Sequence, residues 1–326
     1  MPFPSPHPGF QIRPAIPADS PACLSLTFRA LASLLEAACL PVQERPFPCA
    51  AAVVEQTATG RIVGLILLGP PLNQGPGLQV HSLMVSAPFR RQGLGRALLD
   101  ATLTLPPMQP GWPLRTEWSD RLPARDAFAA TLTAAGWTPP RAVLLRIQGP
   151  VRHTPLMIPR REAMLARAAR NGVTLTPWTE LTAQDRADLA TACDGWDAAG
   201  ILPGWADPRP ALTVAPSPYA LLLRTGPEAG GIGGWITCIH HTSPQRWLFP
   251  LGWVRPDLTN RGILMLTLAD VTLRLHRDHG PDAIAAFETS YDTPDMWSLL
   301  ERHFVPHSHL NGMTVDRLMS SRHPVP

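Results

Sequence analysis

The sequence contains no lysine, and all 28 of its Lys and Arg residues are arginine. Together with 39 prolines and many alanines, this absence indicates a bias of genomic composition rather than a binding signal. The formal net charge is only +3, which is too small to indicate nucleic acid or an anionic membrane as a partner. We therefore expect neither class of partner.

Cysteine is also scarce, and its five residues are widely spaced with no C-x-x-C pair. This pattern predicts neither a disulfide framework nor a zinc site, so no metal is expected. The opening "MPFPSPHPGF" lacks the basic and apolar regions of a signal peptide. The longest apolar run, residues 62–69, is far shorter than the roughly 20 residues of a membrane span. A soluble, cytoplasmic protein is expected.

With 326 residues, the chain is long enough for two domains. Residues 1–9 are expected to form a disordered Pro-rich tail, and residues 10–148 the first domain. Residues 149–172 are expected to form a linker with a short helix, and residues 173–326 the second domain. In the first domain, strands are predicted over 10–15, 49–56, 61–69, 77–85, 113–119 and 141–148, and helices over 19–40, 94–101 and 124–136.

The second half repeats this order of elements. Strands are predicted over 173–178, 219–226, 230–241, 246–254, 283–290 and 313–321, and helices over 160–172, 179–196, 262–280 and 294–304. "VSAPFRRQGLGRALL" aligns with "VRPDLTNRGILMLTL". Val85 then falls on Val254 and Gly93 on Gly262 (254 − 85 and 262 − 93 are both 169). The common register predicts an internal duplication.

The stretch "RRQGLGR", Arg90–Arg96, is predicted to lie between a strand and the start of a helix. The first turn of a helix leaves about four backbone N–H groups unpaired and carries partial positive charge. Glycine lets a phosphate approach such amides closely, so this turn is suited to a pyrophosphate. Its glycine spacing differs from that of the Rossmann and P-loop motifs.

In this order of elements, residues 10–148 resemble the GNAT superfamily of N-acetyltransferases. Their signature, [Q/R]-x-x-G-x-[G/A], is matched by "RRQGLG". "FQIRPAIPADSPA" is similar to the family's first strand and helix, and Gly136-Trp137 stands where a late Gly-Phe is usual. The resemblance implies an α/β fold of the α+β mixed-sheet kind, with two tandem GNAT-like domains, each a central mixed sheet flanked by helices. The second half carries the resemblance more faintly.

The resemblance also implies how acetyl-coenzyme A would bind as cosubstrate. The loop amides of residues 91–96 would hold its pyrophosphate, and the strand end would pair with its pantetheine. A backbone N–H near Val85 would stabilise the oxyanion. The implied coenzyme-binding residues are Leu83, Met84, Val85, Arg90, Arg91, Gln92, Gly93, Leu94, Gly95 and Arg96.

The acceptor amine must lose a proton before it attacks. Many family members use a Glu four residues before the Val that ends the strand, and that position is His81 here. A histidine with its ordinary pKa near 6.5 can act as a base at neutral pH. Glu117 on the next strand is the rival base, and Glu55 on the earlier hairpin is a weaker candidate. A structural role for His81 is equally open at this stage.

One expected residue is missing. The family often has a Tyr that protonates the leaving thiolate, and its position is Leu132 here. Tyr291, in the second half, is a candidate to replace it. Two functions are therefore considered: an enzyme that acetylates a small-molecule or peptide amine by direct attack, and a catalytically inactive coenzyme A-binding sensor or interaction module.

The second half is expected to be a degenerate copy that does not bind coenzyme. In the register of the duplication, Thr259 replaces Arg90, Leu264 replaces Gly95 and Pro250 replaces His81. These changes remove a cation, add bulk where a phosphate would approach, and remove the base. The expected assembly is a monomer or a homodimer.

Overall fold

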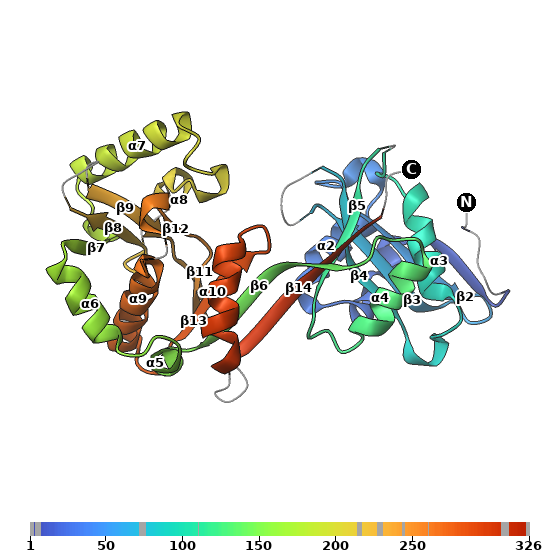
Figure 1. Cartoon of the computed structure of the whole chain (residues 1–326). Coiled ribbons are helices and arrows are strands. Elements are labelled where there is room, and N and C mark those ends of the chain that lie inside the picture. Colours follow the sequence, from blue (N-terminus) through green and yellow to red (C-terminus); the bar gives the residue numbers. More distant parts are fainter. Residues whose placement is uncertain are drawn as a thin grey trace. The chain divides into compact units, whose positions relative to one another are not determined.

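The computed structural model describes residues 3, 8–71, 76–109, 111–213, 217–226, 231–242, 245–259, 261–307 and 313–323. The chain folds as two compact units (Figure 1). The first unit contains Met1–Val143 and Arg317–Pro326, and the second contains Leu144–Asp316. Most of the predicted tail lies outside the described residues. Within it, the Phe3 N–H donates to the Ile12 carbonyl at 2.9 Å.

The first unit is built on a mixed sheet with the strand order β1-β2-β3-β4-β5-β14. The pairs β1–β2, β2–β3 and β3–β4 are antiparallel. The pair β4–β5 is parallel, and β14 is antiparallel to β5. The central strands are apolar on both faces because both faces are covered. The strands are β1 (Phe10–Pro14), β2 (Ala50–Gln56), β3 (Arg61–Gly69), β4 (Leu78–Val85), β5 (Leu114–Ser119) and β14 (Thr314–His323).

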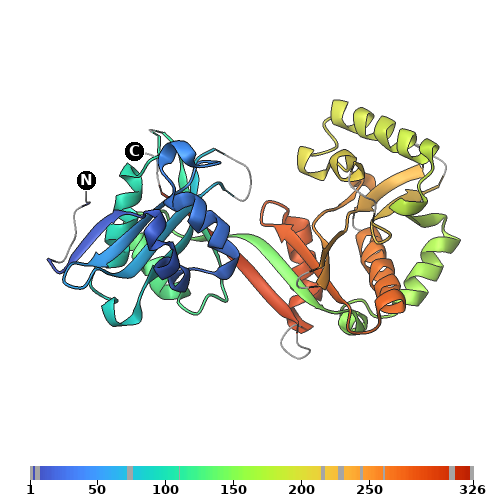
Figure 2. The same ribbon diagram turned by 180° about the vertical axis from the view of Figure 1, so that it is seen from behind.

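Helices cover both faces of this sheet. Helices α3 (Leu94–Ala101) and α4 (Arg125–Ala134) lie over one face, in front of the sheet in Figure 1. Helices α1 (Ser20–Cys23) and α2 (Ala32–Cys39) lie over the other face, which Figure 2 turns toward the viewer. Separate clusters of buried side chains lie on the two faces, with Leu98 and Trp118 in one and Leu35 and Leu67 in the other. The site described below lies at the fork between β4 and β5.

The second unit contains two sheets. One has the order β6-β13-β11-β10 and the other the order β12-β9-β8-β7. The elements are β6 (Arg141–Pro150), β7 (Val173–Pro177), β8 (Leu221–Thr225), β9 (Ile232–Ile236), β10 (Ile239–Thr242), β11 (Gln245–Phe249), β12 (Gly252–Val254), β13 (Ile284–Ser290), α5 (Thr154–Met157), α6 (Arg161–Arg170), α7 (Ala183–Ala198), α8 (Arg209–Leu212), α9 (Ile263–His279) and α10 (Pro294–His303).

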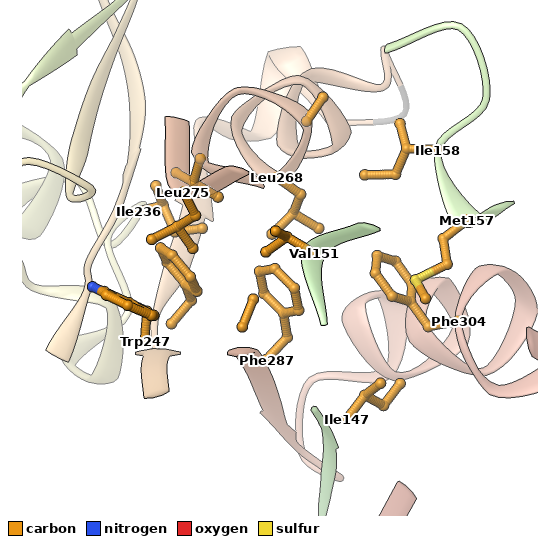
Figure 3. Close-up of a cluster of buried hydrophobic side chains, with 14 of the residues drawn as sticks. Ile147, Val151, Met157, Ile158, Ile236, Trp247, Leu268, Leu275, Phe287 and Phe304 are labelled. Carbon is orange, nitrogen blue, oxygen red and sulfur yellow. The ribbon is translucent and has the colours of Figure 1, made fainter. Parts of the chain in front are cut away.

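The main core of the second unit lies between the first of these sheets and helix α9. Figure 3 shows Leu268 and Leu275 of α9 close to Phe287 of β13, all of them buried. A second cluster, with Cys193 of α7 and Trp235 of β9, packs on the other sheet. Two long strands predicted over 230–241 and 246–254 are each divided in the structure. Their parts β9 and β12 join one sheet, while β10 and β11 join the other.

The compact units divide the chain differently from the predicted domains. The strand that ends the first half, β6, pairs with β13 of the second unit from Leu144 to Pro150. The strand that ends the second half, β14, pairs with β5 of the first unit from Leu318 to His323. Local sequence pattern predicts a strand but not which sheet edge it joins, so the exchange was not foreseen. The limits of the two duplicated halves, residues 10–148 and residues 173–326, remain a prediction.

The backbone repeats at the aligned turn. Short 3-10 turns, η5 (Ala87–Phe89) and η11 (Pro256–Leu258), follow β4 and β12, and their positions differ by 169 at both ends (256 − 87 and 258 − 89). Helices α3 and α9 then begin after a glycine with positive φ, 75° at Gly93 and 71° at Gly262. This geometry supports the predicted duplication.

Candidate functional site

The strands β4 and β5 pair over only three residues each and then separate. Their parallel pairing joins Leu78–Val80 to residues 114–116. Among the described residues, no pairing joins the remainder of β4 to β5. The second edge of β5 is occupied by β14 along its whole length. The result is a fork whose open edge runs along β4 from His81 to Val85.

Backbone groups of β4 point into this open edge. In the antiparallel pairing of β3 with β4, Val85 lies opposite Gly64, and the following residue, Ser86, donates its N–H to Val63 at 2.8 Å. Hydrogen-bonded and non-hydrogen-bonded pairs alternate in such a ladder. Val85 and Leu83 are therefore non-hydrogen-bonded positions, whose N–H and C=O groups face away from β3. An extended ligand with amide groups can pair with them as an added strand.

The open edge leads into the start of helix α3. Its N-cap is Gly93, and the first intrahelical bond runs from the Ala97 N–H to the Gly93 carbonyl at 3.0 Å. The amides of residues 94–96 therefore precede the intrahelical pattern and remain for an external acceptor. A Cβ at Gly95 would lie 3.6 Å from Thr131 Cγ2 of α4, an ordinary van der Waals distance, so Gly95 faces α4. The amides of residues 94–96 have the geometry of an anion site at a helix N-terminus.

The charged side chains of the turn itself are cationic. Arg91 has a φ of 63°, a left-handed conformation that is uncommon for a non-glycine residue. Arg96 is exposed, and its Nε lies 3.9 Å from Asp100 one turn further along α3. Arg90 folds back onto β4, where its Nε donates to the Val85 carbonyl at 2.8 Å. The sequence did not predict this last contact, because the signature implied only phosphate binding.

His81 lies at an irregularity of β4. The register between β3 and β4 shifts between Leu67 and Leu68, which face Ser82 and Val80, so His81 is the extra residue of a bulge. Bulges redirect side chains and often occur beside active sites. The ring of His81 lies on the face of α2, because both its Cδ2 and Leu34 Cδ1 are close to Gly69 (3.2 and 2.8 Å from the ideal Cβ position).

A backbone carbonyl fixes the protonation pattern of this ring. His81 Nε2 lies 2.9 Å from the Pro70 oxygen, which can only accept a hydrogen bond. Nε2 therefore carries the proton, and Nδ1 is the free basic atom of the neutral ring. Burial lowers the pKa of His81 below its ordinary value, and the bond to Pro70 opposes this only in part. The ring is therefore neutral at pH 7. Nothing in the sequence indicated this contact between His81 and Pro70.

Glu117 lies on β5, the strand next to that of His81. Val80 pairs with Thr116, so His81 and Glu117 are the first residues after the last paired position of each strand. Leu114 and Trp118 belong to the core on the α3 face, so Glu117 is directed to the opposite face, as His81 is. The weaker candidate, Glu55, is engaged elsewhere, in an ion pair with Arg13 at 2.6 Å.

No replacement for the missing tyrosine is found next to the fork in the described part of the first unit. Leu132, at the expected position, is buried in the core on the α3 face. Tyr291 belongs to the second unit, where it is exposed and packs edge-on against Trp297 at 5.1 Å between ring centroids. Its proposed role as an acid is untested.

The aligned turn of the second unit has different contents. Leu264, in the place of Gly95, lies with its Cδ1 3.0 Å from the ideal Cβ position of Gly252, which aligns with Leu83. Its side chain therefore fills the space beside the strand. Thr259, in the place of Arg90, bonds to the Pro256 carbonyl within its own turn. Arg255 is paired with Asp257 at 2.5 Å, which adds a carboxylate to this turn.

Comparison with known families gives a match within the first unit. Residues 25–105 match the sequence model described as "Acetyltransferase (GNAT) family". This range includes β4, the turn and α3. This part of the first unit is therefore similar to the GNAT acetyltransferases, a family whose general activity is acyl transfer. The comparison with curated proteins gives no match.

Solved structures extend the likeness to the whole chain. A GCN5-related N-acetyltransferase from Sphaerobacter thermophilus is similar over 99% of this chain and 98% of its own, with 17% identity and a TM-score of 0.52. A tandem GNAT protein from the clavulanic acid biosynthesis pathway is similar over 97% and 99%, with 17% identity and a TM-score of 0.52.

A third similar structure is the glucosamine N-acetyltransferase region of a fungal multi-domain β-N-acetylglucosaminidase. It has 13% identity, a TM-score of 0.58, and covers 96% of this chain. The chain spans only 38% of that longer protein. At these identities the likeness concerns the fold: the chain has the mixed α/β fold of tandem GNAT proteins.

In the described part of the chain, no helix is long and apolar enough to cross a membrane. No group of three or more His, Cys, Asp or Glu side chains in that part is arranged to hold a metal ion.

Proposed function

We propose that the protein is an acetyl-coenzyme A-dependent N-acyltransferase that transfers an acetyl group to the primary amine of a small molecule or peptide. The observation that supports this most strongly is the open edge of β4. Its outward-facing groups at Leu83 and Val85 lead directly to the unpaired amides of α3 and to three arginines. A pantetheine amide chain followed by a pyrophosphate fits this sequence of groups.

In the proposed complex, the pantetheine arm pairs as an added strand with the outward-facing backbone groups of Leu83 and Val85 and passes Met84 between them. Amides from the turn and α3 hold the pyrophosphate, with charge from Arg91 and Arg96 nearby. Gly93 supplies the positive φ that starts the helix, and Gly95 would let the phosphate approach the backbone closely. Arg90, Gln92 and Leu94 complete the proposed coenzyme-binding residues.

Transfer would proceed by direct attack, without a covalent enzyme intermediate. The amine nitrogen forms a bond to the thioester carbon, and the carbon–sulfur bond breaks to release the coenzyme thiolate. The Val85 N–H, directed into the open edge, would donate to the oxygen that gains negative charge. Orientation of the two substrates in the fork supplies the remaining advantage over solution.

We assign proton removal from the amine to His81, acting through Nδ1. Its neutral form at pH 7 and the Pro70 carbonyl that holds Nε2–H support this assignment. Glu117 is the alternative base, since it flanks the same end of the paired region. The amine proton passes to the base, and the thiolate leaves without an assigned acid.

A second function remains to be tested. The buried Leu132 in place of the usual tyrosine favours a coenzyme A-binding sensor or interaction module without catalysis. The intact turn and the position of His81 favour the enzyme. We propose a cytoplasmic location, supported by five cysteines that are all free thiols. The second half is proposed to be a degenerate GNAT-like domain that supports or shapes the acceptor site.

The deciding experiment combines binding with turnover. Calorimetric titration with acetyl-coenzyme A tests the donor site directly. Release of free thiol is then followed with a panel of small-molecule and peptide amines, and products are identified by mass spectrometry. Binding with amine-dependent thiol release supports the enzyme, whereas binding without any release supports the sensor. Absence of binding contradicts both.

A further inference from the structure

The side chain of Arg90 covers the end of the open edge of β4. Its Nε donates to the Val85 carbonyl at 2.8 Å, and its Nη2 lies 3.7 Å from Met84 Sδ. The Val85 carbonyl faces the fork, as the hydrogen-bond pattern with β3 requires. The guanidinium thus occupies one of the backbone acceptors that an added strand would use.

This contact has a consequence for ligands that enter the fork. A guanidinium that leaves a neutral carbonyl needs another acceptor, and in the unliganded protein that acceptor is water. A phosphate is a stronger partner than a neutral carbonyl, because it brings a full negative charge and can accept two parallel hydrogen bonds from the guanidinium. A ligand with a pyrophosphate next to its amide chain offers this partner, whereas an amide chain alone does not.

We propose that Arg90 determines donor selectivity: its guanidinium covers the Val85 carbonyl until a pyrophosphate draws it away, so that thioesters of coenzyme A are preferred over thioesters of the pantetheine arm alone. This inference rests on the proposed function, because it concerns the same donor site. Arg90 then has two alternative partners, the Val85 carbonyl in the free protein and the pyrophosphate in the complex.

The chain itself contains a comparison for this role. In the aligned turn of the second unit, Thr259 takes the place of Arg90. Its hydroxyl bonds to the Pro256 carbonyl at 2.6 Å, inside the turn. In their described parts, the two turns share a short 3-10 turn and a glycine N-cap with a φ above 70°. The contact from the turn to the strand end therefore comes from the arginine side chain and not from the turn conformation.

The experiment compares coenzyme A with pantetheine, which lacks the phosphates, as ligands of the whole protein. Dissociation constants are measured by ligand-observed NMR titration for the wild type, Arg90→Met and Arg90→Gln. We expect both variants to bind coenzyme A more weakly and pantetheine about threefold to tenfold more tightly, since one competing hydrogen bond is removed. Arg96→Met is the matched control, because it removes a charge from the same helix start without a contact to β4. It should weaken coenzyme A binding alone.

Unchanged or weaker binding of pantetheine in both Arg90 variants overturns the inference and leaves an ordinary phosphate contact. Melting temperatures close to that of the wild type verify that the variants are folded, and the Gln variant provides a second measurement if the Met variant is not. If the wild type binds coenzyme A but the Arg90 variants bind pantetheine no more tightly than the wild type does, only the role of Arg90 is contradicted. A wild type that does not bind coenzyme A contradicts the proposed function as well.

Discussion

His81 and Glu117 lie at the two sides of one fork, each directly after the last paired residue of its strand, Val80 in β4 and Thr116 in β5. The two residues were rival candidates in the sequence, 36 positions apart (117 − 81). In the fold they belong to the same face of the sheet and the same end of the paired region. Their positions alone do not decide between them, so variants of both are needed to separate their roles.

Replacement of His81 by Ala is expected to lower turnover at neutral pH about 10²–10⁴-fold, the usual contribution of a general base. Burial lowers the pKa of His81 below the ordinary value of about 6.5, so its neutral, active form already predominates at pH 7. The wild-type rate should therefore fall as pH decreases through a value below 6.5. The pH profile of kcat/KM measures this, and the variant should recover partly at high pH, where the amine loses its proton unaided.

Replacement of Glu117 by Gln tests the rival assignment. If His81 is the base, this variant should retain the acidic limb of the wild-type pH profile, with a change in rate of less than about tenfold. Stopped or continuous thiol-release assays over the same pH range give the comparison. Loss of the limb in the Gln variant, with the limb retained in His81→Ala, would transfer the role of base to Glu117.

The sequence predicted most strands and helices of both units, because their apolar patterns are long and end at Gly or Pro. It also placed the turn between Val85 and Leu94 and its counterpart in the second half. Here the backbone is dictated locally, by a glycine whose φ must be positive, 75° in one copy and 71° in the other. Such positions can be read from sequence because few other residues tolerate the conformation.

Contacts between distant segments could not be predicted in the same way. The exchange of β6 and β14 depends on which sheet edges are free. The alternating residue pattern of a strand does not show which edge the strand will join. The bond from His81 of β4 to Pro70, the residue after β3, depends on a bulge in the register of these two strands. The hydrogen bond from Arg90 to the Val85 carbonyl depends on the conformation of the arginine side chain, whereas the signature specifies only the residue type.

The Gly93→Val variant is expected to bind acetyl-coenzyme A at least tenfold more weakly, a loss of about 1.4 kcal/mol. Valine is strained at a φ of 75°, so the helix start that holds the anion would be distorted. Gly262→Val is the matched control, because Gly262 has nearly the same φ at the aligned position. Calorimetric titration of both variants should show the loss for Gly93 alone. Equal affinities would argue against an anion site at α3.

One molecule of coenzyme is expected per chain. In the second unit, the Leu264 side chain fills the space next to Gly252, and Asp257 adds negative charge to the turn. Both features oppose a pyrophosphate at α9. Calorimetry should therefore give a stoichiometry of one, and Arg261→Ala should leave the affinity unchanged. Two equivalent molecules per chain, in a titration or in electron density, would refute the assignment of the second half as degenerate.

The first half is expected to be insoluble or much less stable when the chain ends near residue 155. The reason is the exchanged strand: β14 pairs with β5 from Leu114 to Ser119, whereas β4 pairs with β5 at only its first three residues.

Truncation would also remove the contacts of the last strand with Thr138 and Trp137. The Thr138 N–H donates to the Arg322 carbonyl at 3.0 Å, and the Arg322 N–H donates to Thr138 Oγ1 at 2.8 Å. His323 packs edge-on against the ring of Trp137 at 5.5 Å. A long unpaired edge beside buried Trp118 is a site for aggregation.

A chain that ends at residue 313 separates this explanation from a general need for the second unit. It keeps residues 144–313 but lacks β14, so it should also aggregate or melt at a lower temperature. The matched control ends at residue 323, which keeps β14 whole, and it should behave as the full chain does. Solubility after expression and thermal unfolding followed by circular dichroism give the comparison. A soluble fragment of residues 1–155 that binds acetyl-coenzyme A with full affinity would show that β14 is dispensable for the first unit.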